Sequence, residues 1–358
     1  MDRRTLLRTG AGLAGSLALA GCLGGLETQS TRAPPLVEDR PDGVYVPSHV
    51  EGMEMAGTNT GGDFAFGLMY SYPHRFWTVT GDTVERTDIA AEDDLHLMTS
   101  VWDPETGTVI PDTGLSVEIY RDGSLVSQEV IYPMLSQPMG FHYGANFGLE
   151  GDGDYTVRLS VGALSTRRTG SFRDRFTEPA SVDVPLAYSQ AATEEISYER
   201  LTERAGERGA VDPMSMEMLP GSVAPSASEL PGTVLGSARS DDADLLVTVL
   251  DSPPAGIDAD GQYLAVSART RYNRMLIPSM ALSGTLSRDG EPVFDGEFVR
   301  TLDPDLRYHY GAVVDGVESG DELTLRPTVQ PQTARHEGYE TAFGGLGGGM
   351  PEVSLSVE

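Results

Sequence analysis

The sequence predicts an all-β protein built from two immunoglobulin-like β-sandwich domains that are joined by a short helix and a flexible linker. With 358 residues, the chain is long enough for two ordinary domains. Its body consists of short segments rich in β-branched and aromatic residues, bounded by Gly, Asp, Asn and Pro, a pattern typical of strands. Several motifs of the first half recur in the second half, which indicates a duplicated fold. A small open barrel is the alternative architecture for each copy.

Residues 1–22 resemble an export signal with a lipidation site. Two arginines, Arg3 and Arg4, precede an apolar run too short to span a bilayer, as in twin-arginine signals. The run ends in Leu-Ala-Gly-Cys, which resembles a lipobox in which Cys22 is lipidated. We therefore expect an exported protein, lipid-anchored on the outer face of the cytoplasmic membrane, with residues 23–45 as a flexible tether. Because Cys22 is the only cysteine, the mature protein has no disulfide and no thiolate metal ligand.

Residues 46–190 should form the first β-sandwich. The segments "DFAFGLMYSY", "DDLHLMTSVW", "GLSVEIYRDGSLVSQEVIY" and "GDYTVRLSV" have the composition and alternation of strands. The "RDGS" sequence between two alternating runs predicts a hairpin, since Asp-Gly accepts the positive φ angles of tight turns.

Residues 191–233 should connect the two sandwiches. We expect a helix in "ATEEISYERLTERAGERG", with Thr193 as its N-cap and Gly206 or Gly209 near its end. A Pro/Met/Ser linker of low order follows. Residues 234–358 should then form a second, degenerate β-sandwich repeat.

The duplication rests on a constant spacing. Ile110-Pro111 recurs as Ile277-Pro278, Arg121-Asp122-Gly123 as Arg288-Asp289-Gly290, and His142-Tyr143-Gly144 as His309-Tyr310-Gly311, each 167 positions later. Three matches at one spacing, without a gap, are hard to obtain by chance in unrelated strands.

The charge of the chain limits its partners. The formal net charge is -29, and all 25 basic residues are arginine. Such a lysine-free, acidic surface suits a high-salt environment, where salt screens self-repulsion, so we expect a halophilic source. Nucleic acid is excluded as a partner because no basic patch could neutralise phosphates.

Histidines and methionines of the first half form a candidate metal site. On the "DDLHLMTSVW" strand, His96 and Met98 leave the same face because they are two residues apart. The stretch "YPMLSQPMGFHYGAN" adds Met134, Met139 and His142. Imidazole and thioether together favour copper, especially Cu(I), over calcium or magnesium. Each residue taken alone would more often be core filler or a structural histidine.

The duplication strengthens the group as a whole. At the spacing of 167, His96 becomes Tyr263, Met98 becomes Ala265, Met134 becomes Thr301 and Met139 becomes Leu306, while His142 persists as His309. Core methionines would normally be exchanged for other apolar residues. The replacements therefore indicate a site held by the first copy alone, although His142 could instead serve the fold by fixing a turn.

The same motifs resemble those of the periplasmic ferrous-iron transport proteins. "PM" followed by "HYGAN", the strand "DDLHLM" and the opening "GMEMAG" look like that family's signatures, over 52–187 and more weakly from 232 to the end. The chain is similar to a duplicated, haloarchaeal-type member. The resemblance implies an immunoglobulin-like fold, dimers, copper bound through His and Met, and iron uptake beside a membrane permease.

Carried over by position, the resemblance implies His96, Met134 and His142 as ligands. Met98 stands where the family has a carboxylate, and Met139 could substitute for Met134 because the spacing to His142 is one residue longer. A further family histidine has no match in the first copy. His336, in the equivalent loop of the second copy, could complete the site across the domain interface.

Two other features are weaker candidates. Met214, Met216 and Met218 could form a mobile Cu(I) collector or simply an apolar linker. His74, in "YSYPHRFW", is expected in a strand leading into a bend, more often a structural position than a ligand.

These inferences together predict an extracytoplasmic lipoprotein that binds copper, and ferrous iron as a further candidate, for metal uptake or delivery to a membrane permease. We expect no enzymatic activity. The alternatives are a structural or adhesion β-sandwich lipoprotein without metal, and an enzyme with a copper or iron centre. Elemental analysis of the purified protein would separate them.

Overall fold

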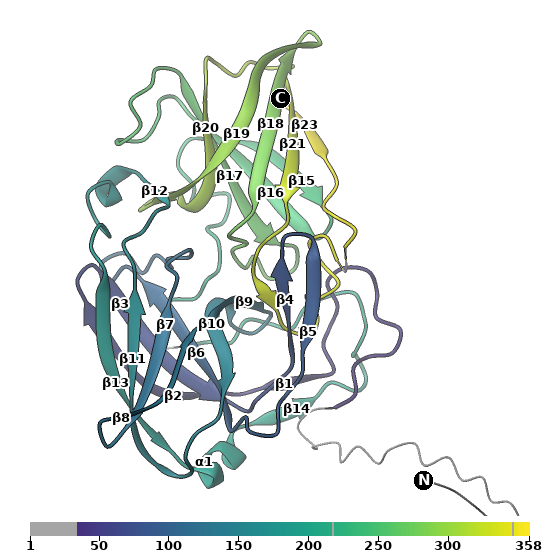
Figure 1. The fold of residues 1–358 in the computed structure, drawn as a ribbon. Helices are drawn as coiled ribbons and strands as arrows, with labels where there is room; N and C mark the ends of the chain where they lie inside the picture. The colour runs from purple at the N-terminus through teal and green to yellow at the C-terminus, as the bar shows by residue number, and fades with distance from the viewer. Residues whose placement is uncertain (1–33, 217, 346) are drawn as a thin grey trace, which may run out of the picture.

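The computed structural model describes residues 34–216, 218–345 and 347–358, and it confirms the all-β fold with two β-sandwiches (Figure 1). The first has a sheet of order β2-β3-β6-β10-β9-β22-β4-β5 that faces a second sheet of order β13-β11-β7-β8. The bounds of the larger sheet are β2 (Glu54–Gly61), β3 (Phe64–Ser71), β6 (Leu95–Trp102), β10 (Gly140–Phe147), β9 (Tyr132–Ser136), β22 (Ala334–Arg335), β4 (Phe76–Thr80) and β5 (Thr83–Thr87). The smaller sheet consists of β13 (Ala180–Tyr188), β11 (Gly153–Val161), β7 (Ser116–Arg121) and β8 (Ser124–Val130).

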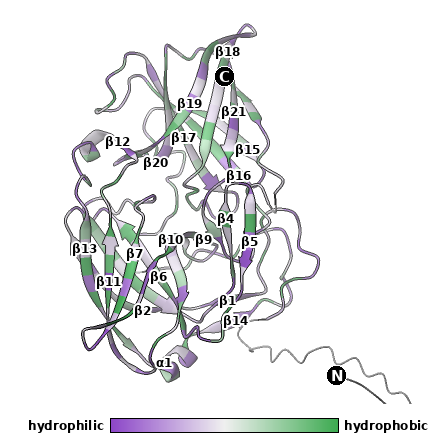
Figure 2. Cartoon of the chain, viewed as in Figure 1, coloured by the Kyte–Doolittle hydropathy of each residue, from purple (hydrophilic) through white to green (hydrophobic). Residues whose placement is uncertain are grey.

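The second β-sandwich is one continuous sheet of order β15-β16-β17-β20-β19-β18-β21-β23 that folds over on itself. Its strands are β15 (Thr233–Ser240), β16 (Ala243–Leu250), β17 (Gln262–Thr270), β20 (Arg307–Val314), β19 (Glu291–Asp303), β18 (Ala281–Arg288), β21 (Glu322–Val329) and β23 (Val353–Ser356). The long β19 covers the positions of β8 and β9 in the first copy, so one strand joins the two layers. Figure 2 shows hydrophobic residues concentrated on the strands, for example on β7, β11 and β13.

The two copies use the same internal contacts. The hydroxyl of Tyr143 accepts a hydrogen bond from the N–H of Thr113 (2.9 Å), and that of Tyr310 accepts one from the N–H of Met280 (3.0 Å). Both tyrosines are fully buried, so the bond satisfies a hydroxyl that would otherwise be costly to bury. The Tyr of each His-Tyr-Gly motif therefore anchors the fold.

The two sandwiches are related like the subunits of a two-fold symmetric dimer. Ser279 and Asp112 occupy equivalent positions 167 residues apart, and the hydroxyl of Ser279 donates to Oδ1 of Asp112 at 2.6 Å. In a two-fold arrangement, equivalent positions meet where they lie on the symmetry axis.

Each copy also sends a short strand into the other. β22, from the second half, lies between β9 and β4 of the first sandwich, as the yellow segment beside β4 in Figure 1 indicates. β12 (Arg167–Arg168), from the first half, pairs with β19 of the second sandwich. The registers are equivalent, because Ala334 is opposite Met134 and Arg167 is opposite Thr301.

The expected helix is mostly wrong. Only α1 (Gln190–Glu195) is helical, and its N-cap is Ser189 instead of Thr193. The following residues form β14 (Tyr198–Arg200), which pairs with β1 (His49–Glu51), and then turns. A 3-10 turn, η1 (Gly170–Phe172), is the other helical element of the described chain. Tertiary pairing with β1 overrides the helical preference of this Glu/Arg/Ala-rich stretch.

The linker and the end of the tether contact both sandwiches. Leu219 is buried against the first sandwich and Leu230 against the second. Val44 and Tyr45, at the end of the predicted tether, are buried too, and the N–H of Gly43 donates to the carbonyl of Thr341. The predicted signal, with Cys22, lies outside the described residues. No helix of the described chain reaches the length and apolarity that a membrane crossing demands.

Candidate metal centre

Five side chains converge where β22 enters the first sandwich. His96 lies on β6, Met134 on β9 and His142 on β10, while His74 precedes β4 and His336 follows β22. The N–H of His336 donates to the carbonyl of Leu135 (3.1 Å), which extends the pairing of β22 with β9. We call His74, His96, Met134, His142 and His336 the first-domain cluster.

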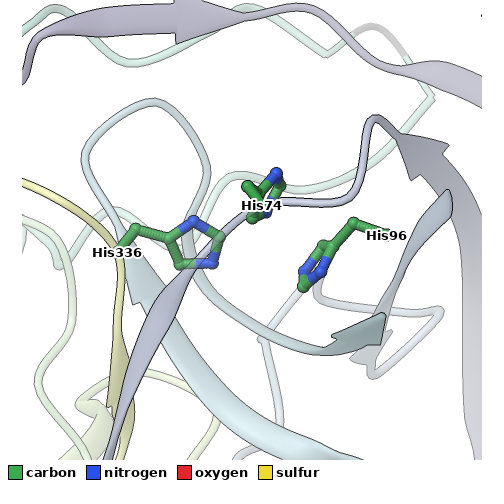
Figure 3. Close-up of side chains that lie close together, drawn as sticks. All are labelled: His74, His96 and His336. Carbon is green, nitrogen blue, oxygen red and sulfur yellow. The ribbon is translucent and has the colours of Figure 1, made fainter. Parts of the chain in front are cut away.

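The distances bring these side chains within reach of one ion. His74, His96 and His336 each offer a ring nitrogen, and these atoms lie within 4.8 Å of one another (Figure 3). The ring of His142 is centred 5.3 Å from that of His336. Nε2 of His336 is 3.4 Å from Sδ of Met134.

Gly144 keeps the middle of the cluster open. A Cβ atom at this position would lie 2.7 Å from Nε2 of His96 and 3.0 Å from Sδ of Met134. Any larger residue would therefore fill the space between two candidate ligand atoms. This explains why glycine follows His-Tyr at this point in the strand.

Hydrogen bonds orient three imidazoles in the same way. Nδ1 of His142 donates to the carbonyl of Gly140 (3.0 Å), and Nδ1 of His74 donates to Oε2 of Glu51 (2.8 Å). Nδ1 of His96 donates to Oδ1 of Asn146 (2.8 Å), an oxygen that also accepts the N–H of His74. In each of the three rings Nε2 is buried and has no hydrogen-bond partner. A buried polar atom without a partner is costly, and an ion would relieve that cost.

Burial also keeps the rings of His96, His142 and His336 neutral. It lowers the pKa of His142 to about 4 and the pKa values of His96 and His336 well below their ordinary range. Metal ligands must be deprotonated, so these histidines are ready to bind an ion near neutral pH without losing a proton.

The carboxylate of Glu51 accepts a hydrogen bond from His74 and orients its ring. Burial alone would raise the pKa of Glu51, but the electrostatic attraction and the hydrogen bonds of His74 and His49 lower it to about 2. Nε2 of His49 contacts the other carboxylate oxygen at 3.0 Å, and Nδ1 of His49 lies 3.9 Å from Glu337. A carboxylate behind a histidine is a common outer partner of metal ligands, because it fixes the ring and raises its basicity.

The structure separates the candidate ligands into two groups. His96, Met134 and His142 lie together, and His336 joins them across the domain interface. Met98 and Met139 lie in a neighbouring apolar group and line a cavity of about 90 Å³ that His74 and His336 also line. Met216 packs against that group, whereas Met218 is exposed.

His74 is the residue that the sequence analysis undervalued. Its position depends on the β4–β5 hairpin, which the second copy lacks, so the duplication could not reveal it. The available signal was its place among aromatic residues in "YSYPHRFW". The structure places its ring 3.9 Å from that of His96, centre to centre.

The equivalent place in the second sandwich is closed. Nδ1 of His309 donates to the carbonyl of Arg307, as in the first copy, but Nε2 accepts a hydrogen bond from the hydroxyl of Tyr263 (2.9 Å). Arg167, from β12, donates to this hydroxyl (3.0 Å), to Oγ1 of Thr301 (2.9 Å) and to the carbonyl of Gly311 (3.0 Å). The guanidinium therefore takes the space that an ion would need, and its charge repels cations.

Comparisons with known proteins give one family and a few solved structures. The family model of DUF7350, a domain of unknown function, matches residues 54–171 and 228–355, one stretch in each β-sandwich. No curated protein matches significantly.

Two similar structures are of FetP from uropathogenic Escherichia coli strain F11. A copper-bound variant is 18% identical with a TM-score of 0.28, and the match covers 38% of this chain and 97% of that one. The protein as isolated is 19% identical with a TM-score of 0.28, over 39% and 96% of the two chains. The fibronectin(III)-like modules of Clostridium thermocellum CbhA are 13% identical, with a TM-score of 0.13 over 74% and 85%.

Proposed function

The chain belongs to the family of DUF7350, a domain of unknown function, and from its first-domain cluster we propose that it binds copper for metal uptake or delivery to a membrane permease. The observation that carries the proposal is the set of three buried Nε2 atoms without a hydrogen-bond partner, in His74, His96 and His142. A purely structural cluster would have satisfied these atoms, as the second sandwich does at His309.

The donor set favours copper among the common metals. Sδ of Met134 is a soft thioether, and neutral imidazoles surround it, a combination that suits Cu(I) and also accepts Cu(II). Zinc sites more often recruit Cys, Asp or Glu, none of which belongs to the cluster. The resemblance to the ferrous-iron transport proteins supports ferrous iron as a second cargo carried near the same place.

The cellular setting follows from the N-terminal sequence. The twin arginines and the lipobox around Cys22 support export and a lipid anchor on the outer face of the cytoplasmic membrane. The protein would capture the ion and hand it on without bond-making chemistry. The two sandwiches of one chain would take the places of the two subunits that the resemblance implies.

Copper titration of the full-length mature protein tests the proposal. The protein is purified without chelator or affinity nickel, analysed for metals, and titrated with Cu(II) and, under reducing conditions, with Cu(I) against a chromophoric competitor. We expect one tight site per chain and nitrogen couplings in the Cu(II) electron paramagnetic resonance spectrum. The His96→Ala/His336→Ala variant should bind copper at least about 100-fold more weakly.

The second sandwich supplies the matched control. His309→Gln removes the equivalent histidine from a place that is already closed, so copper affinity should stay unchanged. Equal copper affinity in the wild type and in His96→Ala/His336→Ala would refute the proposal, as would a loss of affinity that His309→Gln reproduces.

A further inference from the structure

A group of methionines lies directly beside the first-domain cluster. Met69, Met98 and Met139 are buried together, and Met53, Met55 and Met216 pack against them. We call these six residues the methionine group. They are six of the 13 methionines of the chain, brought together from the β1–β2 connection, β2, β3, β6, the β9–β10 turn and the linker.

Strand register arranges part of this group as a row that leads to the cluster. Met55 is opposite Met69, Met69 is opposite Met98, and Met98 is opposite Gly144. Neighbouring residues across antiparallel strands share one face of the sheet. The row therefore ends at Gly144. Nε2 of His96 and Sδ of Met134 both lie close to this glycine.

The second sandwich keeps this part of the fold without any sulfur. The equivalents of Met98 and Met139 are Ala265 and Leu306, both buried in an apolar group around Tyr263. Thr248, opposite Ala265, takes the place of Met69. The sheet can thus pack here with smaller or polar residues, so packing alone does not demand thioethers.

Three thioethers and three histidines share one small cavity. Met53, Met98 and Met139 line it together with His49, His74 and His336, and its volume is about 90 Å³. That volume exceeds the roughly 15 Å³ that a single small occupant needs. Glu51, Glu337 and Arg75 also line it, so two carboxylates face one guanidinium, and the remaining negative charge suits a cation.

We propose that Met53, Met98 and Met139 form a thioether site for a soft monovalent cation, Cu(I), next to the first-domain cluster. Thioethers bind Cu(I) well and Cu(II), zinc or iron poorly, so this site selects the reduced ion. The inference rests on the proposed function, because it gives the copper protein a second, adjoining position. The cavity adjoins both positions, because His74 and His336 of the first-domain cluster also line it.

Silver titration tests the thioether site, because Ag(I) mimics Cu(I) without redox chemistry. The Met53→Leu/Met98→Leu/Met139→Leu variant keeps the apolar volume nearly constant. It should lose about one equivalent of bound Ag(I) while its Cu(II) spectrum at the histidines stays unchanged. Met280→Leu, at a buried methionine of the second sandwich, is the control and should keep the full stoichiometry.

Nuclear magnetic resonance signals of the methionine methyl groups provide a second readout. This measurement uses the wild-type protein, so it does not depend on whether a variant folds. In wild-type protein with ¹³C-methyl methionine, Ag(I) should shift the signals of Met53, Met98 and Met139. Unshifted signals there, or an unchanged Ag(I) stoichiometry in the triple variant, would overturn the inference. Failure of the proposed function looks different, because Cu(II) binding would then survive in His96→Ala/His336→Ala while the silver results stand.

Discussion

The two β-sandwiches hold the same histidine in the same backbone position and surround it differently. Nδ1 of His142 and of His309 each donate to a carbonyl two residues earlier, at 3.0 Å in both copies. Nε2 of His142 has no partner, whereas Nε2 of His309 is bonded to the hydroxyl of Tyr263. The histidine therefore belongs to the fold, and its neighbours decide whether it is free to bind an ion.

The exchanged strands sharpen this difference. At equivalent positions, β22 brings Ala334 to the first sandwich and β12 brings Arg167 to the second. The small side chain leaves room for His336, and the large one fills the equivalent space with a charged group. One architecture thus yields an open site and a closed one through a few side chains.

The largest expected effect comes from filling the open site. Gly144→Ala should weaken copper binding at least about a thousandfold, or ~4 kcal/mol. The new methyl group would lie 2.7 Å from Nε2 of His96 and 3.0 Å from Sδ of Met134. Gly311→Ala should leave copper affinity unchanged and lower the melting temperature instead, because its methyl would collide with the hydroxyl of Tyr263. If Gly144→Ala binds copper as tightly as the wild type, the ion does not lie beside Gly144.

Opening the closed site should mainly cost stability. Arg167→Ala removes charged hydrogen bonds to Tyr263, Thr301 and Gly311, and we expect a loss of about 3 kcal/mol. Urea denaturation of the metal-free protein measures it. The exposed Arg173, paired with Asp174 on the surface, is the control, and Arg173→Ala should cost under about 1 kcal/mol. Similar losses in both variants would mean that Arg167 does not support the second sandwich.

Acid should destabilise both copies alike. Burial lowers the pKa values of His142 and His309 to about 4, while in the unfolded chain they titrate near 6.5. Between these values the unfolded state binds protons that the folded state does not, so stability is complete above pH 6.5 and falls toward pH 4. Each histidine should contribute a loss of about 2 kcal/mol between pH 7 and 5.

Denaturation of metal-free protein at the two pH values checks this expectation. His142→Gln and His309→Gln should each flatten the pH dependence to the same extent. A change in one variant alone would show that the two histidines are not equally buried in solution.

The smallest effect on copper affinity is expected from Glu51, whose carboxylate accepts a hydrogen bond from His74. His74 belongs to the part of the first sandwich that has no counterpart in the second. Glu51→Gln keeps the shape of the side chain but removes the charge that supports His74. Copper affinity should fall about tenfold, measured by competition titration. Glu54→Gln, at an exposed position close by, should have no effect. An unchanged affinity in Glu51→Gln would exclude His74 from the ligand set.

Much of this fold could be predicted from the sequence, because its information is local or strictly periodic. Alternation placed His96 and Met98 on one face of β6, and the constant spacing of 167 aligned the copies without a gap. The exchanged strands could not be predicted, since β22 has only two residues and its pairing joins segments about 200 residues apart. The helix expectation failed where Tyr198 pairs with Glu51 across the sheet.

The candidate site was predictable where its residues lie on regular strands. His96, Met134 and His142 follow from strand geometry and from the comparison of the two copies. The place of His74 depends on an inserted hairpin. The role of Gly144 depends on which atoms lie where a side chain at that position would be. Neither leaves a periodic signal, so both required the three-dimensional arrangement.

The insertion of β22 has a consequence for how the protein behaves on dilution. In a complex of two separate subunits, a histidine supplied by the neighbour is lost when the complex dissociates. Here His336 is tied to the other four residues by the same polypeptide, at an effective concentration in the millimolar range or above. The protein should therefore hold its ion equally well as a single dilute molecule.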